Sequence, residues 1–275
     1  MTPRRLLAEA SAQLQACATP KLDAELLLCH TLKKDRSWLI AHADDVLDEA
    51  IINDFNILLA RRIRREPVAY ITGEKEFWSR SFQVNPDVLI PRPETEHLIE
   101  AVQENFPDQQ AENSFCDIGT GSGCIAITLA CEYPKARIIA TDISSQALAV
   151  ARRNAERHGV SDRITFVQGD MFAALTKDIA TFDAIISNPP YVAQHEMGEL
   201  EAELDFEPQQ ALSDGQDGLS FLRLLIRQAG DWLGANGLLI VETGQCGLPD
   251  EENGLKLQQR ITDLAGHLRG GLYHH

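Results

Sequence analysis

The stretch Phe182-Asp183-Ala184-Ile185-Ile186-Ser187-Asn188-Pro189-Pro190-Tyr191 decides how this chain of 275 residues is interpreted. Its first six residues are mostly apolar, which predicts a buried strand. The strand cannot continue through Asn-Pro-Pro-Tyr, because two prolines remove two backbone donors and fix two φ angles. Asn188 is held extended by the proline that follows it. The sequence therefore predicts a stiff loop at the carboxyl end of a strand, where ligands bind in open α/β sheets.

This loop has two interpretations. A rigid turn without a function is the simpler explanation of Asn-Pro alone. The full tetrapeptide favours a functional site, because it ends a predicted strand and lies downstream of a glycine-rich loop. We therefore treat Asn188, Pro189, Pro190 and Tyr191 as candidate catalytic residues.

Segments typical of strands alternate with segments typical of helices between residues 114 and 242. This alternation is the signature of a parallel sheet with crossover helices, so the predicted fold class is α/β. The expected strands are 114–118, 137–142, 164–167, 182–187 and 238–242, and the expected helices are 124–131, 145–158 and 219–233.

The first third of the chain has a different character. Apolar residues follow helical spacing from residue 1 to about 65, which predicts a small antiparallel bundle. A β-hairpin around 79–81 and the proline-stiffened connector Ile90-Pro91-Arg92-Pro93 follow it. The expected domains are a helical bundle over 1–74, a hairpin linker over 75–93 and an α/β domain over 94–275.

A glycine-rich loop, Asp117-Ile118-Gly119-Thr120-Gly121-Ser122-Gly123, follows the first strand of the predicted sheet. Glycines let a backbone turn sharply and approach a ligand closely. The dinucleotide fingerprint Gly-x-Gly-x-x-Gly does not fit, because the third glycine comes one residue early and Cys124 takes its place. A dinucleotide dehydrogenase is therefore disfavoured. Asp117 adds a carboxylate that suits a cationic ligand, such as the ammonium of a methionine moiety. We take Asp117, Gly119, Thr120, Gly121, Ser122 and Gly123 as candidate binding residues.

Two further strand ends carry acidic residues. Asp142 closes the second predicted strand, where its two carboxylate oxygens can accept hydrogen bonds from both ribose hydroxyls. Asp170 and Met171 follow the third strand, where a carboxylate and apolar side chains can bracket an adenine ring. Together with Asn188, these residues complete a candidate binding site for a ligand that contains a nucleoside.

Charge and cysteine usage narrow the class of partner. Residues 1–80 hold as many basic as acidic residues, so residues 81–275 carry the whole net charge of −16. A duplex nucleic-acid binder usually has a basic footprint, and only Arg61, Arg62, Arg64 and Arg65 form a basic cluster here. We interpret that cluster as the solvated end of a helix, with a docking role as the alternative. The six cysteines lack Cys-x-x-Cys pairs and zinc spacing, so we expect reduced thiols and no metal.

The apolar segments are short. No stretch reaches the roughly 18–20 apolar residues of a membrane span, and the start Met1-Thr2-Pro3-Arg4-Arg5 lacks the apolar core of a signal peptide. We therefore expect a cytoplasmic protein without a membrane partner.

The ordered set of glycine loop, acid at the second strand end, Asp170 and Asn-Pro-Pro-Tyr resembles the class I S-adenosylmethionine-dependent methyltransferases. Glu66-Pro67-Val68-Ala69-Tyr70-Ile71-Thr72-Gly73 and Leu89-Ile90-Pro91-Arg92-Pro93-Glu94-Thr95-Glu96 resemble the helical domain and linker of the release-factor glutamine methyltransferases, the HemK/PrmC family. The resemblance implies a Rossmann-like methyltransferase sheet with a helical bundle that recognises the substrate.

The resemblance also implies a reaction. A methyl group passes from S-adenosylmethionine, leaving S-adenosylhomocysteine, to the side-chain amide nitrogen of the glutamine in the Gly-Gly-Gln motif of class 1 peptide chain release factors. In this interpretation Asn188 and the Pro189 carbonyl accept the two amide hydrogens, and Tyr191 packs against the flat amide. The loop alone also suits an adenine-N6 methyltransferase on DNA or RNA. The acidic charge of residues 81–275 disfavours that alternative, and we expect no direct nucleic-acid binding. A non-catalytic binding module is the third interpretation.

Two segments remain open at this level. The acidic run over 196–217 contains no Lys or Arg, and suggests either a solvated face or a docking surface for a basic protein domain. Family members usually end with a helix and two strands after a Val-Glu-x-Gly segment. Here residues 245–275 have little β pattern, so we expect a helix around 255–264 and no convincing final pair of strands.

Overall fold

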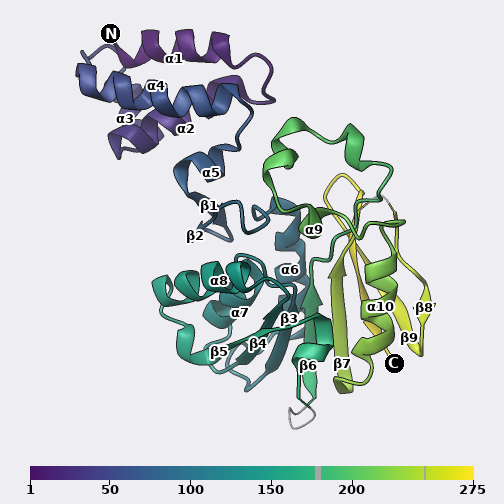
Figure 1. Ribbon diagram of the computed structural model, residues 1–275. Helices are drawn as coiled ribbons and strands as arrows, with labels where there is room; N and C mark the ends of the chain where they lie inside the picture. Colours follow the sequence, from purple (N-terminus) through teal and green to yellow (C-terminus); the bar gives the residue numbers. More distant parts are fainter. Residues whose placement is uncertain (177–180, 245) are drawn as a thin grey trace. The chain divides into compact units, whose positions relative to one another are not determined.

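The computed structural model describes residues 1–176, 181–244 and 246–275. Its internal contacts divide the chain into two compact units (Figure 1). The first consists of Met1–Glu74 together with Glu201–Phe206, and the second of Lys75–Leu200 together with Glu207–His275. The short segment Glu201–Phe206 therefore folds with the first unit, although the chain before and after it belongs to the second.

The first unit is a helical bundle, as the spacing of its apolar residues predicts. Its helices are α1 (Pro3–Gln13), α2 (Pro20–Leu32), α3 (Arg36–Ala41), α4 (Glu49–Ile63) and α5 (Val68–Thr72). Local sequence fixes the helix ends: the Thr2 hydroxyl caps α1, which has a proline in its first turn, and the Asp35 side chain caps α3. The bundle core contains Leu14, Leu27, Leu28 and Phe55.

The second unit is built on an eight-stranded sheet with the order β5-β4-β3-β6-β7-β10-β9-β8. Its parallel part consists of β3 (Ser114–Ile118), β4 (Arg137–Asp142), β5 (Ile164–Gln168), β6 (Phe182–Ser187) and β7 (Leu233–Glu242). The antiparallel part consists of β8 (Glu251–Glu252), β9 (Leu255–Thr262) and β10 (Leu268–His274). This arrangement confirms the predicted α/β class with a Rossmann-like parallel sheet.

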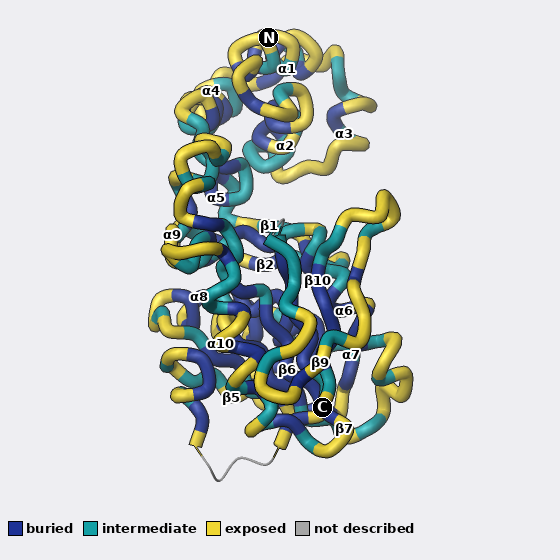
Figure 2. The backbone as a smooth tube through the Cα atoms, turned by 90° about the vertical axis from the view of Figure 1, so that its right-hand side faces the viewer, coloured by how far each residue is buried: buried dark blue, intermediate teal, exposed yellow. Residues whose placement is uncertain are grey.

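Helices pack on both faces of the sheet because strand residues alternate between two apolar cores. Phe115 and Ile186 face the core formed with α6 (Glu96–Asn105), α7 (Cys124–Glu132) and α8 (Ser145–Arg157). Cys116 and Ile185 belong to the opposite core, formed with α10 (Ser220–Ala229). Figure 2 shows the central strands β6 and β7 largely buried. A strand covered on both faces consists mostly of consecutive apolar residues. These strands could therefore be predicted from the sequence.

A small hairpin and several short helical turns complete the second unit. The hairpin is β1 (Glu74–Phe77) with β2 (Arg80–Gln83), close to its predicted place. The short turns are η1 (Pro93–Thr95), η2 (Ser161–Arg163), η3 (Met171–Ala174), η4 (Met197–Glu199) and α9 (Gln209–Leu212), while η5 (Ala202–Phe206) lies in the segment that folds with the first unit.

The prediction for the C-terminal segment was wrong. Residues 255–262 form strand β9 rather than a helix, and β10 pairs with both β7 and β9. A Cβ at Gly270 would clash with the carbonyl oxygen of Val241 in β7, so the two strands approach each other closely only because that side chain is missing. The sheet is therefore completed by a strand that contains glycines. Glycine has a low β-strand propensity, so this pairing is not expected from the sequence.

Among the described residues, no helix combines the length and apolarity that a membrane span requires.

Candidate functional site

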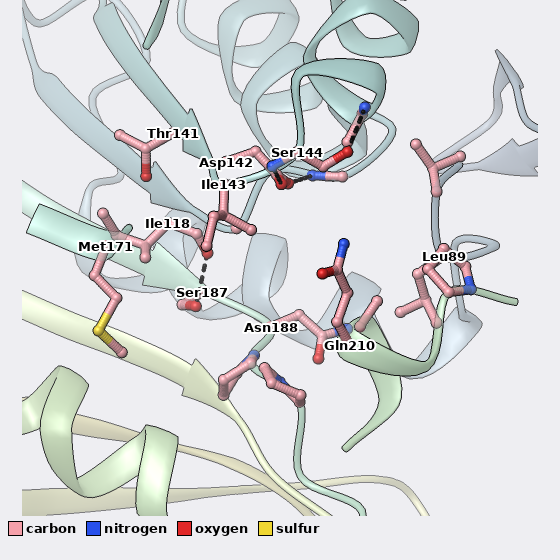
Figure 3. A pocket seen from close by; sticks show the side chains of 18 of the residues that line it. Leu89, Ile118, Thr141, Asp142, Ile143, Ser144, Met171, Ser187, Asn188 and Gln210 are labelled. Atoms are coloured by element: carbon pink, nitrogen blue, oxygen red, sulfur yellow. Dashed lines mark hydrogen bonds between the residues drawn. The ribbon is translucent and has the colours of Figure 1, made fainter. Parts of the chain in front are cut away.

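Four parallel strands end at one edge of the sheet and lead into one pocket (Figure 3). The loops after β3, β4, β5 and β6 contribute Gly119, Asp142, Met171 and Asn188 respectively. Strand β3 lies between β4 and β6, so the order of the strands reverses here, and an open α/β sheet forms its ligand crevice at such a point. The pocket has a cavity volume of about 120 Å³ and is open to solvent on one side.

The glycine loop turns from β3 into α7 through three left-handed glycines. Gly121 has φ +55° and Gly123 has φ +83°. A Cβ at Gly123 would lie 2.8 Å from Ile127 Cδ1, so this glycine is needed both for its backbone angle and for close packing of the helix. Gly119 and Gly121 line the pocket. Thr120, Ser122 and Gly123 do not line it, and they shape the loop from behind.

Asp117 is fully buried at the end of β3 rather than on the pocket wall. Its Oδ2 accepts hydrogen bonds from the Thr120 hydroxyl at 2.6 Å and from the Ala126 amide at 3.2 Å. Burial raises the pKa of the carboxyl group to about 7, although these hydrogen bonds favour the charged form. Its buried Oδ1 has no hydrogen-bond partner among the described residues.

Asp142 is held rigidly at the end of β4. Its Oδ2 accepts from the Gly121 amide at 2.9 Å and its Oδ1 from the Ser144 amide at 2.9 Å. Burial raises the pKa of this carboxyl group, and the backbone donors oppose the change. Asp142 also lines the pocket, so its carboxylate can accept hydrogen bonds from hydroxyl groups of a ligand.

The third strand end contributes Asp170 and Met171, which both line the pocket. Met171 has a left-handed backbone with φ +46°, a conformation that is uncommon outside glycine. The pocket also has walls that the sequence did not indicate as binding residues, among them Leu89, Ile143 and Gln210. Ile143 could have been found from the sequence, because it is an apolar residue directly after the acid that ends β4. In the structure it is 58% exposed.

The loop after β6 has two anchored ends. The Asn188 Nδ2 atom donates a hydrogen bond to the Thr95 hydroxyl at 3.1 Å. The Tyr191 hydroxyl donates to Glu242 Oε1 at 3.0 Å. Thr95 and Glu242 were not predicted as site residues, although both lie in segments that carry the family resemblance. Their partners are 93 and 51 residues away along the chain, so only folding brings them together.

Glu242 is a buried carboxyl group at the end of β7, only 1% exposed. Burial raises its pKa to about 7, while hydrogen bonds from Thr95 and Tyr191 act in the opposite direction. Burial and the neighbouring Glu242 also raise the pKa of the Tyr191 hydroxyl well above its usual value, so Tyr191 stays neutral and acts as a donor.

The loop separates the pocket from a second hollow. Asn188, Pro189 and Pro190 line the pocket described above, whereas Tyr191 lines an open cleft on its other side. That cleft is rich in charged side chains: Arg92, Glu94, Glu196, Glu199, Glu242 and Arg269. A ligand in each hollow would therefore meet at Asn-Pro-Pro-Tyr.

Several acidic residues of the run over 196–217 accept hydrogen bonds or form ion pairs within the protein, and others are exposed. Glu207 accepts from the Ile90 amide at 3.0 Å and pairs with Arg92 at 2.5 Å. Asp214 accepts from the amides of a tight turn, including Ser220 at 2.9 Å. Only part of the run, notably Glu196 and Glu199, faces the open cleft.

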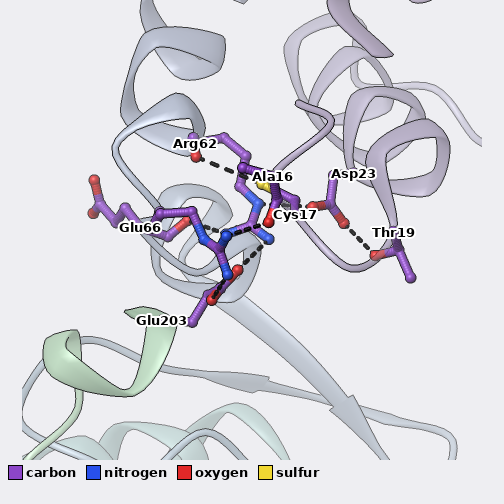
Figure 4. Close-up of polar contacts among 8 residues, drawn as sticks. Ala16, Cys17, Thr19, Asp23, Arg62, Glu66 and Glu203 are labelled. Atoms are coloured by element: carbon purple, nitrogen blue, oxygen red, sulfur yellow. Dashed lines mark hydrogen bonds and ion pairs between the residues drawn. The ribbon is translucent and has the colours of Figure 1, made fainter. Parts of the chain in front are cut away.

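Glu203 of the same run takes part in a buried ion-pair cluster within the helical unit (Figure 4). Arg62 Nη2 lies 2.9 Å from Glu203 and its Nε lies 2.7 Å from Asp23, while Arg65 pairs with Glu203 as well. Arg62 is only 5% exposed, so the interpretation of the arginine cluster as a solvated helix end was wrong for this residue. No sequence pattern indicates a pairing between residues so far apart in the chain.

No group of three or more His, Cys, Asp or Glu side chains able to hold a metal ion occurs within the described part of the chain.

Family models match most of both units. One described as PrmC N-terminal domain matches residues 5–73, and one described as Methyltransferase small domain matches residues 93–216.

Curated proteins with related sequences cover nearly the whole chain. Release factor glutamine methyltransferase of Nitratidesulfovibrio vulgaris is 44% identical over 246 residues, which are 88% of this chain and 82% of that protein. Release factor glutamine methyltransferase of Neisseria gonorrhoeae is 41% identical over 252 residues, 90% of each chain. The Bifunctional methyltransferase of Rickettsia conorii is 37% identical over 300 residues, which cover 97% of this chain and 56% of that protein.

Solved structures share the fold at much lower identity. The N-terminal domain of human METTL16 in complex with SAH matches with a TM-score of 0.51 and 20% identity, covering 70% of this chain and 74% of that one. A crystal structure of the hMettl16 catalytic domain matches with a TM-score of 0.55 and 19% identity, covering 78% and 79%.

Proposed function

The chain belongs to the family of release factor glutamine methyltransferases, and we propose that it methylates the side-chain amide nitrogen of the glutamine in the Gly-Gly-Gln motif of class 1 release factors. It is an S-adenosylmethionine-dependent methyltransferase. The observation that carries the proposal for its site is the pair of hydrogen bonds that fix Asn188 and Tyr191 between two hollows.

The pocket at the strand ends fits the methyl donor. Gly119 and Gly121 let the backbone approach a ligand, Asp142 presents two fixed oxygens suited to a ribose, and Met171 offers an apolar wall for a base. Asp117 supplies a buried, unpartnered oxygen that suits a cationic amino group. When bound, S-adenosylmethionine supplies an electrophilic methyl group on a positively charged sulfur.

The loop makes the substrate amide nitrogen, which is a poor nucleophile, reactive by fixing its position. An amide nitrogen is a weak nucleophile because its lone pair is delocalised into the carbonyl group. The Asn188 Nδ2 atom is engaged by Thr95, and no described residue donates to Asn188 Oδ1, so that oxygen is the free acceptor. With the Pro189 carbonyl it can accept both hydrogens of a substrate amide and fix the nitrogen in line, which supplies much of the rate of such reactions.

The remaining two residues of the loop support that geometry. Pro190 stiffens the backbone, because its ring fixes φ. Tyr191 is neutral and anchored through its hydroxyl, so its ring can pack against the flat substrate amide. As the methyl group is transferred, the positive charge passes from the sulfur to the substrate nitrogen, which then releases one of its two hydrogens to water as a proton. The N-protonated amide is a strong acid, so no ionised side chain is required as a base.

The organisation and charge of the chain indicate the class of substrate. We assign substrate recognition to the helical unit over 1–74, the linker role to 75–93 and the methyl transfer to 94–275. A release-factor substrate supports the expected cytoplasmic location and requires no direct nucleic-acid binding. The negative charge carried by residues 81–275 is unfavourable for an adenine-N6 methyltransferase acting on DNA or RNA.

The test is mass spectrometry of a release factor incubated with the protein and S-adenosylmethionine. We expect one added methyl group on the Gly-Gly-Gln peptide and none on DNA or RNA offered in parallel. Asn188→Ala should bind S-adenosylmethionine as the wild type does, yet lose about a hundredfold or more of turnover. Asn236→Ala, at an exposed position near the start of β7, is the matched control.

Two outcomes would overturn the proposal. Methylation of adenine in nucleic acid with an unmodified release factor would replace the substrate. Near-normal turnover of Asn188→Ala would remove the assigned role of the loop.

A further inference from the structure

We infer that Thr95 and Glu242 are positioning residues, which set the direction of a hydrogen-bond chain so that Asn188 presents its side-chain oxygen, not its NH₂ group, to the substrate. The inference rests on the function proposed above, because an oxygen acceptor is what a glutamine amide nitrogen requires. It assigns roles to two residues that lie outside the Asn-Pro-Pro-Tyr loop.

Two hydrogen bonds, one at each end of that loop, are the first links of the hydrogen-bond chain. Tyr191 donates its hydroxyl hydrogen to Glu242 Oε1 at 3.0 Å. At the other end, Asn188 donates from Nδ2 to the Thr95 oxygen at 3.1 Å. Thr95 ends the short turn η1 before α6, and Glu242 ends strand β7, so two separate elements of the sheet unit fix the loop.

Thr95 transmits the direction from Glu242 to Asn188. A hydroxyl has one hydrogen, and the Glu242 carboxyl group lies close enough to the Thr95 hydroxyl to accept it. Above about pH 7, where Glu242 is ionised, its carboxylate only accepts, so it takes the Thr95 hydrogen, and the Thr95 oxygen is left to accept from Asn188. The amide of Asn188 then has one orientation in which both of its ends are satisfied: NH₂ toward Thr95 and oxygen toward a substrate.

The environment strengthens this control. Thr95 is 2% exposed and Glu242 is 1% exposed, so water does not compete for their hydrogen bonds. Glu242 Oε2 lacks a hydrogen bond of good geometry among the described residues, although Thr95 lies near enough to favour the charged carboxyl group. Burying an incompletely paired carboxyl group destabilises a fold, so folding alone does not account for it.

The alternative is a purely structural role, in which the two side chains only tie β7 and η1 to the loop. Glu242→Gln separates the two roles. The glutamine amide can donate to the Thr95 oxygen, which turns the Thr95 hydrogen toward Asn188 and favours the flipped amide. It also removes a buried charge. The inference therefore predicts a lower kcat in a protein at least as thermally stable as the wild type, whereas a structural role predicts parallel losses.

Thr95→Val is the second variant, since it removes the hydroxyl but keeps the shape. We expect kcat on the release factor to fall about tenfold or more, with affinity for S-adenosylmethionine unchanged. Thr95→Ser should restore most of the loss. Thr128→Val is the matched control, because Thr128 is a fully buried threonine of α7 whose hydroxyl has no partner among the described residues.

The results distinguish this inference from the proposed function. If the wild type leaves the release factor unmethylated, the proposed function fails. If the wild type methylates it and both Thr95→Val and Glu242→Gln match Thr128→Val in kcat, the inference fails. Nuclear magnetic resonance of the Asn188 side-chain amide gives a test independent of activity: its NH₂ signals should shift strongly in Thr95→Val and should not shift in Thr128→Val. Unchanged signals in Thr95→Val would also overturn the inference.

Discussion

Replacing Glu242 by glutamine should change how the stability of the sheet unit depends on pH. In the folded protein, burial raises the pKa of Glu242 from 4.5 to about 7. Between these two values the unfolded chain has lost this proton and the folded chain has kept it. Stability from this group is therefore fully present below about pH 4.5 and is lost as pH rises through about 7.

The size of the effect follows from the two pKa values. A difference of one in pKa corresponds to about 1.4 kcal/mol, so a rise from 4.5 to about 7 corresponds to about 3 kcal/mol. Glutamine does not titrate, and the variant therefore lacks this loss. Asp117, whose pKa burial also raises to about 7, is present in both proteins and cancels from their difference.

Tryptophan fluorescence can report on the relevant unit alone. The chain has three tryptophans: Trp38 lies in the helical unit, and Trp78 and Trp232 lie in the sheet unit. In a Trp38→Phe background, urea unfolding of the wild type and of Glu242→Gln is compared from about pH 4.5 to about pH 8. The free energy of unfolding of the variant minus that of the wild type should increase by about 3 kcal/mol from the lowest to the highest pH of this range.

A difference between the two proteins that stays constant within about 1 kcal/mol over the whole range would refute the reasoning. It would mean that Glu242 is ionised and well solvated or well paired in the folded state. A difference that grows in the opposite direction, in favour of the wild type at high pH, would show that the carboxylate is stabilised by its surroundings.

Three further predictions concern other parts of the molecule. Asp142→Asn should weaken S-adenosylmethionine binding by about ten- to a hundredfold in calorimetry, because a charged acceptor is replaced by a neutral one, and unchanged binding would contradict its role. Gly270→Ala should lower the free energy of unfolding of the sheet unit by about 1–3 kcal/mol or more, because the new methyl group meets the Val241 carbonyl, as urea titration would measure. Arg62→Met should destabilise the helical unit by about 3–5 kcal/mol, because Glu203 and its neighbours lose their partner in a buried site, and hydrogen exchange in that unit should show it.

The parallel strands were predictable because each is a local pattern. Ser114–Ile118, Arg137–Asp142 and Phe182–Ser187 have the bounds that the sequence predicted, since short apolar runs bounded by turn residues identify buried strands. The last strands were not predictable in the same way. Residues 255–274 are polar and contain glycines, and they form strands because β7 offers them an edge to pair with.

By itself, the sequence determined that a stiff Asn-Pro-Pro-Tyr loop follows a buried strand and that glycines and acids occupy the ends of the strands before it. These features depend on residues next to each other, and proline geometry and strand periodicity act over that range. Only the tertiary structure decided which distant side chains hold the loop. Thr95 meets Asn188 and Glu242 meets Tyr191 because the order of the strands brings η1 and the end of β7 to the same edge. The burial of Arg62 beside Glu203 has the same origin, since pairing between residues far apart leaves no periodic signal in the sequence.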